Sequence, residues 1–169
     1  FDESPELVET VTFPGASFVL EGSRGEAVER ALRLLHLIAG VSYYKAAVPS
    51  DIRINGYSID ADTAALLTEI YENGLGEFAY RNGLSLRGRI HFPADTPSSS
   101  LLEEESAKPV SLTPHALTAI GGGKDSLVSI EALRAAGIEQ TVTWIGSSPC
   151  LAACAARTGV RTLNISRQL

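Results

Sequence analysis

The chain has 169 residues, of which 44% are apolar and 20% charged, and its formal net charge is −6. The length fits one large or two small domains, and the composition is that of a globular protein with a sizeable core. The acidic balance argues against a nucleic-acid partner, which needs a basic surface, and no stretch approaches the roughly 18–20 apolar residues of a membrane span. The N-terminal residues FDESPELVET lack a signal-peptide layout, so we expect a cytoplasmic protein.

The N-terminal region should begin with two short strands. They are predicted within residues 6–22, on either side of a turn at Pro14 and Gly15. A helix should follow, because Ser23 and Glu26 have capping-box spacing and apolar residues then recur at helical intervals as far as Gly40. This pattern indicates a helix with a broad apolar face.

Helices should also dominate the following fifty residues. Pro49 ends the segment VSYYKAAV, and a helix capped by Asp60 or Asp62 should stop at Gly74. The stretch GLGEFAYRNG then predicts a short helical turn, and LSLRGRIHF (84–92) alternates as a strand does. We therefore expect residues 1–92 to form an N-terminal α+β domain.

The composition changes after this region. Residues 93–114 contain four prolines, a serine run and an acidic triplet, which is typical of a linker. Residues 115–169 then alternate between strand and helix patterns. Strands are predicted at 117–120, 140–145 and 160–165, and helices at 124–136 and 149–158.

This βαβαβ pattern predicts a parallel sheet with right-handed crossovers. Three strands make only the first half of a doubly wound α/β sheet. We therefore expect the chain to be a fragment of a larger protein. The rest of the sheet would come from the same protein or from a second chain.

A glycine-rich turn joins the first predicted strand of this half-sheet to its helix. Gly121–Gly123 can curl the backbone into a concave nest of N–H groups that a phosphate can approach closely. The helix N-terminus, Lys124 and the Ser126 hydroxyl would add attraction for an anion. Asp125 suggests either a bound Mg²⁺ or a capping role at the helix start.

Two common phosphate motifs do not fit this turn. The Walker P-loop requires glycine where Thr118 stands and Ser or Thr where Asp125 stands. The dinucleotide fingerprint fails at Ser126, and the second strand is not followed by a ribose-binding acid. A tight turn without any ligand is the alternative interpretation.

The sequence GGGKDS resembles the SGGxDS pyrophosphate loop of the PP-loop ATP pyrophosphatase superfamily, whose fold is adenine nucleotide alpha hydrolase-like. Gly121 replaces the first serine of that motif, which removes one expected phosphate contact. The resemblance implies that ATP is cleaved between its α and β phosphates and that AMP passes to a substrate oxygen. It also implies Mg²⁺, with Asp125 as metal ligand and with Lys124 and Asp125 in catalysis. The cofactor-binding candidates are Gly121, Gly122, Gly123, Lys124, Asp125, Ser126 and Trp144.

Two further stretches, LLHLIAGVSYYKAAVP (34–49) and GLGEFAYRNGL (74–84), resemble the ATP-dependent UDP-N-acetylmuramoyl-L-alanyl-L-glutamate epimerase family (MurL-like). The resemblance implies inversion of the terminal L-glutamate of a UDP-muramoyl dipeptide to D-glutamate. The reaction would pass through a carboxyl-adenylate, release AMP and pyrophosphate, and serve peptidoglycan synthesis. Substrate-binding candidates in these stretches are Tyr43, Tyr44, Lys45, Glu77, Tyr80 and Arg81.

Several of these candidates have a structural alternative. Lys45 is a candidate base and Tyr44 a second catalytic candidate, but the tyrosines could simply pack and Lys45 could only bind an anion. Arg81 could clamp a carboxylate or form an ordinary surface ion pair. Trp144 could help to form an adenine pocket or lie in the core, and His36 is expected to be a hydrogen-bonded core residue.

Two other functional classes stay open at this stage. A PP-loop ligase or tRNA thiolase would need a basic surface and suitably placed cysteines. Cys150 and Cys154 are instead expected to be small buried residues of a helix. A non-catalytic nucleotide-binding module is the third class.

Overall fold

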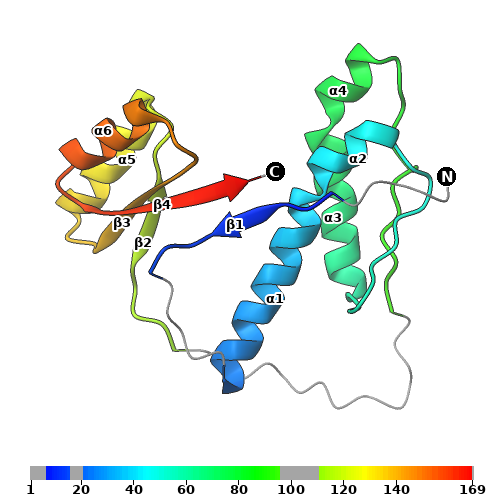
Figure 1. Cartoon of the computed structure of the whole chain (residues 1–169), viewed down its shortest axis with the longest axis horizontal. Helices are drawn as coiled ribbons and strands as arrows, with labels where there is room; N and C mark the ends of the chain where they lie inside the picture. The colour runs from blue at the N-terminus through cyan, green and yellow to red at the C-terminus, as the bar shows by residue number, and fades with distance from the viewer. Residues whose placement is uncertain (1–6, 16–20, 96–110, 169) are drawn as a thin grey trace. The chain divides into compact units, whose positions relative to one another are not determined.

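The computed structural model of the chain describes residues 7–15, 21–95 and 111–168 (Figure 1). The chain divides into two units: a sheet unit, made of Phe1–Phe18 and Ser111–Leu169, and a helical unit, Val19–Val110. The second predicted N-terminal strand falls mainly on residues 16–20, outside the described residues. The same is true of most of the predicted linker. Among the described residues, no helix is long and apolar enough to cross a membrane.

The C-terminal part of the sheet unit confirms the predicted strand–helix alternation. Its elements are β2 (Ala116–Ala119), α5 (Lys124–Ala135), β3 (Gln140–Ile145), α6 (Pro149–Arg157) and β4 (Arg161–Gln168). Strand β3 pairs in parallel with both β2 and β4. The carboxyl ends of the three strands therefore meet at one edge of the sheet.

A strand from the N-terminus completes the described sheet. β1 (Thr10–Thr12) pairs antiparallel with β4, which gives the strand order β1-β4-β3-β2. A two-bond contact between Arg167 and Glu9 reinforces this pairing, with one bond of 3.0 Å from Arg167 Nη2 to Glu9 Oε2. The predicted domain of residues 1–92 included β1, whereas the pairing groups this strand with the C-terminal sheet.

Both helices of the sheet unit cover the same core. Ile130 of α5 and Ala155 of α6 are fully buried against Val142 of β3. The buried Gln140 side chain donates from Nε2 to the Ile130 carbonyl at 2.9 Å, which satisfies a polar group inside this core. The expectation of two buried cysteines is wrong for one of them: the thiol at position 154 packs against this core, whereas Cys150 is exposed.

The helical unit contains α1 (Gly22–Ala39), α2 (Val41–Ala47), α3 (Ala61–Gly74) and α4 (Gly76–Arg81). These bounds confirm the predicted stops near residues 40 and 74. The backbone N–H of Thr63 donates to the Asp60 carboxylate at 2.6 Å, so Asp60 is the N-cap of α3. Of the two aspartates predicted as possible caps, Asp60 thus begins α3 and Asp62 lies inside its first turn.

The predicted capping box at the start of α1 is wrong. The helix begins at Gly22, so Ser23 lies inside its first turn and cannot be the N-cap. Glu21 takes that position in extended backbone and makes no side-chain capping bond. The start of α1 therefore lacks the predicted reciprocal capping bonds.

The strand predicted at 84–92 is also wrong. Gly88 has a φ of +71°, which turns the backbone in the middle of this segment, and its N–H donates to Glu72 Oε1 at 2.6 Å. The apolar residues Leu86, Ile90 and Phe92 are nevertheless buried. Their alternation reflects packing of an irregular segment on helices, so the described part of Val19–Val110 is helical and not α+β.

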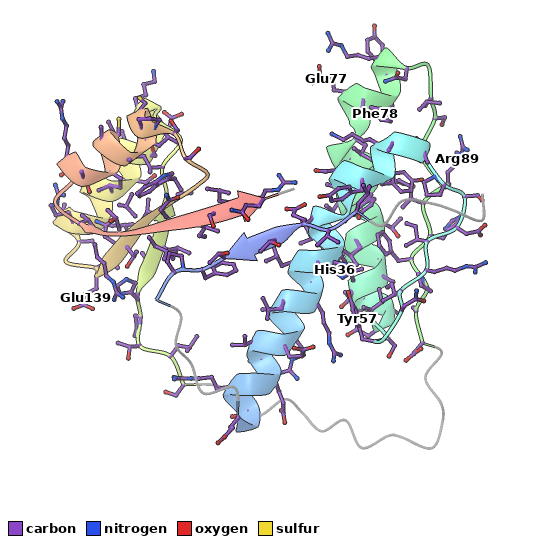
Figure 2. All side chains as sticks on the ribbon, viewed as in Figure 1. His36, Tyr57, Glu77, Phe78, Arg89 and Glu139 are labelled. Carbon is purple, nitrogen blue, oxygen red and sulfur yellow. The ribbon has the colours of Figure 1, made fainter. Side chains whose placement is uncertain are left out.

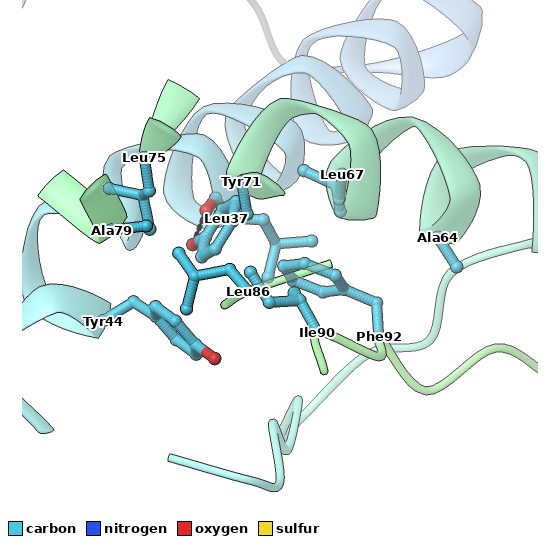
Figure 3. Packing of buried hydrophobic residues seen from close by; sticks show 10 residues of the cluster. All are labelled: Leu37, Tyr44, Ala64, Leu67, Tyr71, Leu75, Ala79, Leu86, Ile90 and Phe92. Carbon is cyan, nitrogen blue, oxygen red and sulfur yellow. Dashed lines mark hydrogen bonds between the residues drawn. The ribbon is translucent and has the colours of Figure 1, made fainter. Parts of the chain in front are cut away.

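Aromatic residues fill the centre of the helical unit (Figure 3). The Tyr71 ring contacts Tyr44 edge-on at a centroid distance of 5.6 Å and Phe92 at 5.0 Å. Leu67 of α3 and Ile90 are fully buried in the same cluster. Such edge-to-face contacts stabilise a core beyond the area that the rings bury, and here they fix α2 and α3 around Tyr71.

Candidate functional site

The glycine turn lies at the carboxyl end of β2, as predicted. Ile120 is buried, and its N–H donates to the Thr143 carbonyl of β3 at 2.8 Å. The chain then leaves the sheet through Gly121–Gly123 and enters α5 at Lys124. In parallel sheets this edge is where helix N-termini and ligands meet.

The backbone of the turn requires glycine at its centre. Gly122 has a φ of +81°, and a Cβ atom there would lie 3.2 Å from Leu151 Cδ2, in the first turn of α6. A Cβ at Gly121 or Gly123 would meet no atom within 4 Å. A side chain at Gly122 would therefore press on α6, whereas the Cβ positions of Gly121 and Gly123 face open space.

The polar residues of the turn begin α5. Lys124 and Asp125 are exposed in its first turn. No side chain caps α5, so the capping role considered for Asp125 is wrong. The Ser126 hydroxyl donates to the Gly123 carbonyl at 2.9 Å, so this bond must open before the hydroxyl can donate to a phosphate.

These features can attract an anion. They are the N-terminus of α5, two glycines with open space at their Cβ positions and the exposed ammonium of Lys124. Among residues 7–15, 21–95 and 111–168, no three His, Cys, Asp or Glu side chains are grouped closely enough to hold a metal ion. A Mg²⁺ ion at Asp125 would therefore take most of its ligands from phosphate oxygens and water.

Trp144 lies on the helix-covered face of the sheet. It is 9% exposed and packs in the core with Ile120 and Val142, which agrees with the core-packing alternative. Its buried Nε1–H has no hydrogen-bond partner among the described residues. Burial of an unpaired donor costs about 1–3 kcal/mol, and a role of Trp144 at an adenine stays a prediction.

In the helical unit, α2 carries the tyrosine pair and the candidate base. The Tyr44 side chain is buried, and its hydroxyl donates to the Pro49 carbonyl at 3.1 Å. Burial raises the pKa of Tyr44, and the nearby Arg89 guanidinium opposes part of this effect. Tyr43 is half-buried and Lys45 is exposed. Packing in the core therefore explains the position of the Tyr44 side chain, whereas the Lys45 side chain is accessible to a ligand.

The second group of candidates lies on α4. The Glu77 and Arg81 side chains form an i,i+4 ion pair of 3.7 Å and are 83% and 74% exposed. This geometry matches the alternative of an ordinary surface pair, which contributes little to stability. Tyr80 is 88% exposed. No described contact joins these three residues to Tyr44 or Lys45.

The structure reveals polar residues that the sequence interpretation did not select. His36 lies on α1 with its Nδ1 2.8 Å from the Tyr57 hydroxyl (Figure 2), so its expected hydrogen bond is confirmed. Its side chain is exposed, so the expectation of a core position is wrong. The Arg33 guanidinium lies over the Tyr57 ring, 5.1 Å from its centroid. His36 also lines a cavity of ≈250 Å³ together with Tyr44 and Arg53. The spacing of residues in the sequence could not predict this cavity, because residues 36, 44 and 53 come from three different segments.

Comparison with known proteins identifies relatives across the whole chain. The MurL N-terminal domain family matches residues 1–169. The chain is 61% identical over 169 residues to the UDP-N-acetyl-alpha-D-muramoyl-L-alanyl-L-glutamate epimerase of Xanthomonas oryzae pv. oryzae (strain MAFF 311018), covering 100% of this chain and 36% of that protein. The epimerase of the same name from Micromonospora sp. is 34% identical over 168 residues, covering 99% and 36%.

A third relative of that name, from Salinispora tropica, is 33% identical over 171 residues, covering 99% of this chain and 36% of the relative. The chain therefore spans about a third of the length of these curated relatives. No solved structure matches the chain.

Proposed function

The chain belongs to the MurL N-terminal domain family, and from this premise we propose that it forms the N-terminal part of an ATP-dependent epimerase. The enzyme would convert the terminal L-glutamate of UDP-N-acetylmuramoyl-L-alanyl-L-glutamate to D-glutamate for peptidoglycan synthesis. The observation that carries the proposal is the 61% identity to an epimerase of that name over every residue of the chain. The remainder of the protein would complete the active site.

The glycine turn supports the ATP dependence in this proposal. Gly121–Gly123, Lys124 and Ser126 would hold the β and γ phosphates, and Asp125 would bind the accompanying Mg²⁺. ATP would supply the AMP group that activates the substrate as a carboxyl-adenylate. N–H donors aimed at developing negative charge are each worth about 3–4 kcal/mol of transition-state stabilisation when well placed.

Activation of the carboxylate explains why an epimerase would consume ATP. An α-proton beside a free carboxylate is hard to remove, because a second negative charge would form next to the first. Once the carboxylate is capped, the acyl group can accept the electrons as an enolate. Removal of the proton on one face and its return on the other then invert the centre, and water releases AMP.

The two candidate groups of α2 would have different roles. Burial raises the pKa of Tyr44, so this phenol keeps its proton at neutral pH and could act only as a proton donor. Lys45 is exposed and would become an effective base only if substrate or the rest of the protein covered it, because desolvation lowers the pKa of an amine. We therefore propose Lys45 as the base in the assembled enzyme.

Product analysis of the full-length protein tests this proposal. With ATP, Mg²⁺ and UDP-muramoyl-L-alanyl-L-glutamate, the expected products are AMP, pyrophosphate and the D-glutamate epimer. AMP formation that depends on tRNA would indicate a ligase or thiolase instead. Binding of ATP without AMP formation under any of these conditions would indicate a nucleotide-binding module and overturn the proposal.

A further inference from the structure

The cavity beside Tyr44 lies wholly within the helical unit, and of its lining residues only Tyr44 has been given a role above. Its volume is ≈250 Å³, and it is lined by His36, Tyr44, Asp51, Arg53, Tyr71 and Phe92, among other residues. The volume is below the range of about 300–1,000 Å³ that is usual for drug-sized ligands. The cavity can therefore take a small molecule or one end of a larger one.

The cavity offers two groups for an anion. Arg53 is exposed beside it, and no bond from its guanidinium to another described residue is found. His36 is also exposed, and because its Nδ1 contacts the Tyr57 hydroxyl at 2.8 Å, the ring is held with Nε2 as its remaining polar atom. A guanidinium can bind a carboxylate with two parallel bonds, and an imidazole whose Nε2 carries a proton can add a third.

The rest of the lining narrows the chemistry of the ligand. Asp51 carries a negative charge on the same rim, where its carboxylate accepts from the Ser50 hydroxyl at 3.0 Å. This carboxylate would repel a highly charged pyrophosphate more strongly than a peptide carboxylate, and it can accept from an amide or ammonium N–H. Tyr71, Phe92 and other apolar groups provide a wall for a short aliphatic body. The lining thus matches a carboxylate, an N–H donor and a small apolar part in one molecule.

We propose that this cavity binds the carboxylate-bearing end of a short acyl peptide, with Arg53 and His36 as the anion-binding residues. The inference deepens the proposed function and rests on it for the identity of the peptide, namely the L-alanyl-L-glutamate end of the substrate. Arg53 and His36 contact the ligand in binding, and neither takes part in proton transfer at this cavity. The helical unit would thereby contribute specificity for the dipeptide.

Binding of N-acetyl-L-alanyl-L-glutamate to the 169-residue chain, without ATP, tests the inference. Calorimetry gives the affinity, and amide NMR shifts at Gly40 and Arg53 give the location. Arg53→Gln should weaken binding about tenfold, as expected for loss of a charge-assisted bond, and His36→Gln should weaken it in the same direction. Arg24→Gln is the matched control: it removes the same charge from exposed α1 surface outside the cavity lining and should leave the affinity unchanged.

Two comparison ligands complete the experiment. The diamide of the same peptide, which has no carboxylate, should bind much more weakly, and inorganic pyrophosphate should not shift the Gly40 amide. The inference is overturned if Arg53→Gln binds as the unmodified chain does, if Arg24→Gln loses as much affinity, if the diamide binds equally well or if pyrophosphate takes the same place. Urea unfolding of each variant checks that the fold is retained.

This test and that of the proposed function fail separately. If the cavity does not bind the dipeptide, the full-length protein can still be an ATP-dependent epimerase, since other residues could hold the dipeptide. Conversely, a protein that binds the dipeptide here but forms no AMP would contradict the proposed function alone. The binding experiment contains no nucleotide, so its outcome does not depend on the glycine turn.

Discussion

The Tyr71 hydroxyl occupies the space that the absent side chain of Gly40 leaves open. A Cβ atom at Gly40 would lie 2.7 Å from that oxygen and 3.1 Å from the Leu37 carbonyl. The hydroxyl donates to the same carbonyl at 2.6 Å, and thereby satisfies a backbone group at the end of α1. One glycine thus allows α3 to be bonded to the C-terminal turn of α1.

Gly40→Ala should therefore destabilise the helical unit. Forcing a methyl group into this contact should lower the free energy of unfolding by about 1–3 kcal/mol, the usual cost of overpacking. Urea unfolding measures the change. Gly76→Ala is the control, because a Cβ there meets no atom within 4 Å. In the double variant with Tyr71→Phe the cost should be smaller than the sum of the single costs; simple additivity would mean that another contact is responsible.

The stability of the helical unit should fall in alkaline solution. Burial, and to a lesser extent the neighbouring Tyr44, raises the pKa of Tyr71 from 10.0 to about 12. Between these two pH values the unfolded chain loses the phenolic proton and the folded chain keeps it, so unfolding becomes easier as pH rises. The contribution is complete below pH 10 and on the order of 2 kcal/mol is lost by pH 12. Urea midpoints across this range should fall less steeply for Tyr71→Phe; an equal slope would contradict the assignment.

Gly122→Ala should weaken anion binding at the glycine turn. An alanine at a φ of +81° is strained, and its Cβ would lie 3.2 Å from Leu151, so the turn should change shape at a cost of about 1 kcal/mol or more. Pyrophosphate binding to the chain, measured by calorimetry, should weaken. Gly121→Ala has open space and should keep the fold. Gly121→Ser, which restores a hydroxyl, should bind pyrophosphate at least as well as the natural turn. Equal binding by Gly122→Ala would argue for a turn without a ligand.

Asp125→Ala should abolish AMP formation by the full-length protein without unfolding it. The side chain is exposed and does not cap α5, so its loss leaves the fold intact while removing the proposed Mg²⁺ ligand. Asp62→Ala is a matched control, since Asp62 also lies in the first turn of a helix that another residue caps. Normal AMP formation by Asp125→Ala would remove this aspartate from the mechanism.

Lys45→Ala should stop exchange of the substrate α-proton with solvent deuterium if Lys45 is the base. Lys45→Arg keeps the positive charge but holds its proton too tightly to act as a base. The arginine variant should therefore bind substrate and still fail to exchange the proton, as measured by NMR of the glutamate α-position. Exchange at the normal rate in both variants would assign Lys45 to anion binding only.

The C-terminal half of the fold could be predicted because its signals are local. Strands β2 and β3 are short runs between turn residues, and β4 follows Gly159 but continues three residues beyond its predicted end at 165. Pro149 begins one helix, and Gly137 follows the end of the other. The pairing of β1 with β4 could not be predicted, because it joins residues about 158 positions apart. No spacing rule relates such distant segments.

The candidate site could likewise be predicted only in part. The glycine turn depends on adjacent residues, and its place at the end of β2 was correct. The alternation at residues 84–92 came from packing on helices, so its period resembled that of a strand. The cavity lined by His36, Tyr44 and Arg53 depends on tertiary packing of three segments, which composition and periodicity do not encode.

The β1–β4 pairing also constrains the order in which the chain can assemble. Residues 19–110 are inserted between the two parts of the sheet unit. Pairing of β1 with β4 therefore closes a loop of about 150 residues. The entropic cost of loop closure grows with the length of the loop. If the helical segment folds around Tyr71 before β1 pairs with β4, the flexible part of that loop becomes shorter. Damage to the aromatic cluster should thus delay attachment of the N-terminal strand, while the three parallel strands form at their normal rate.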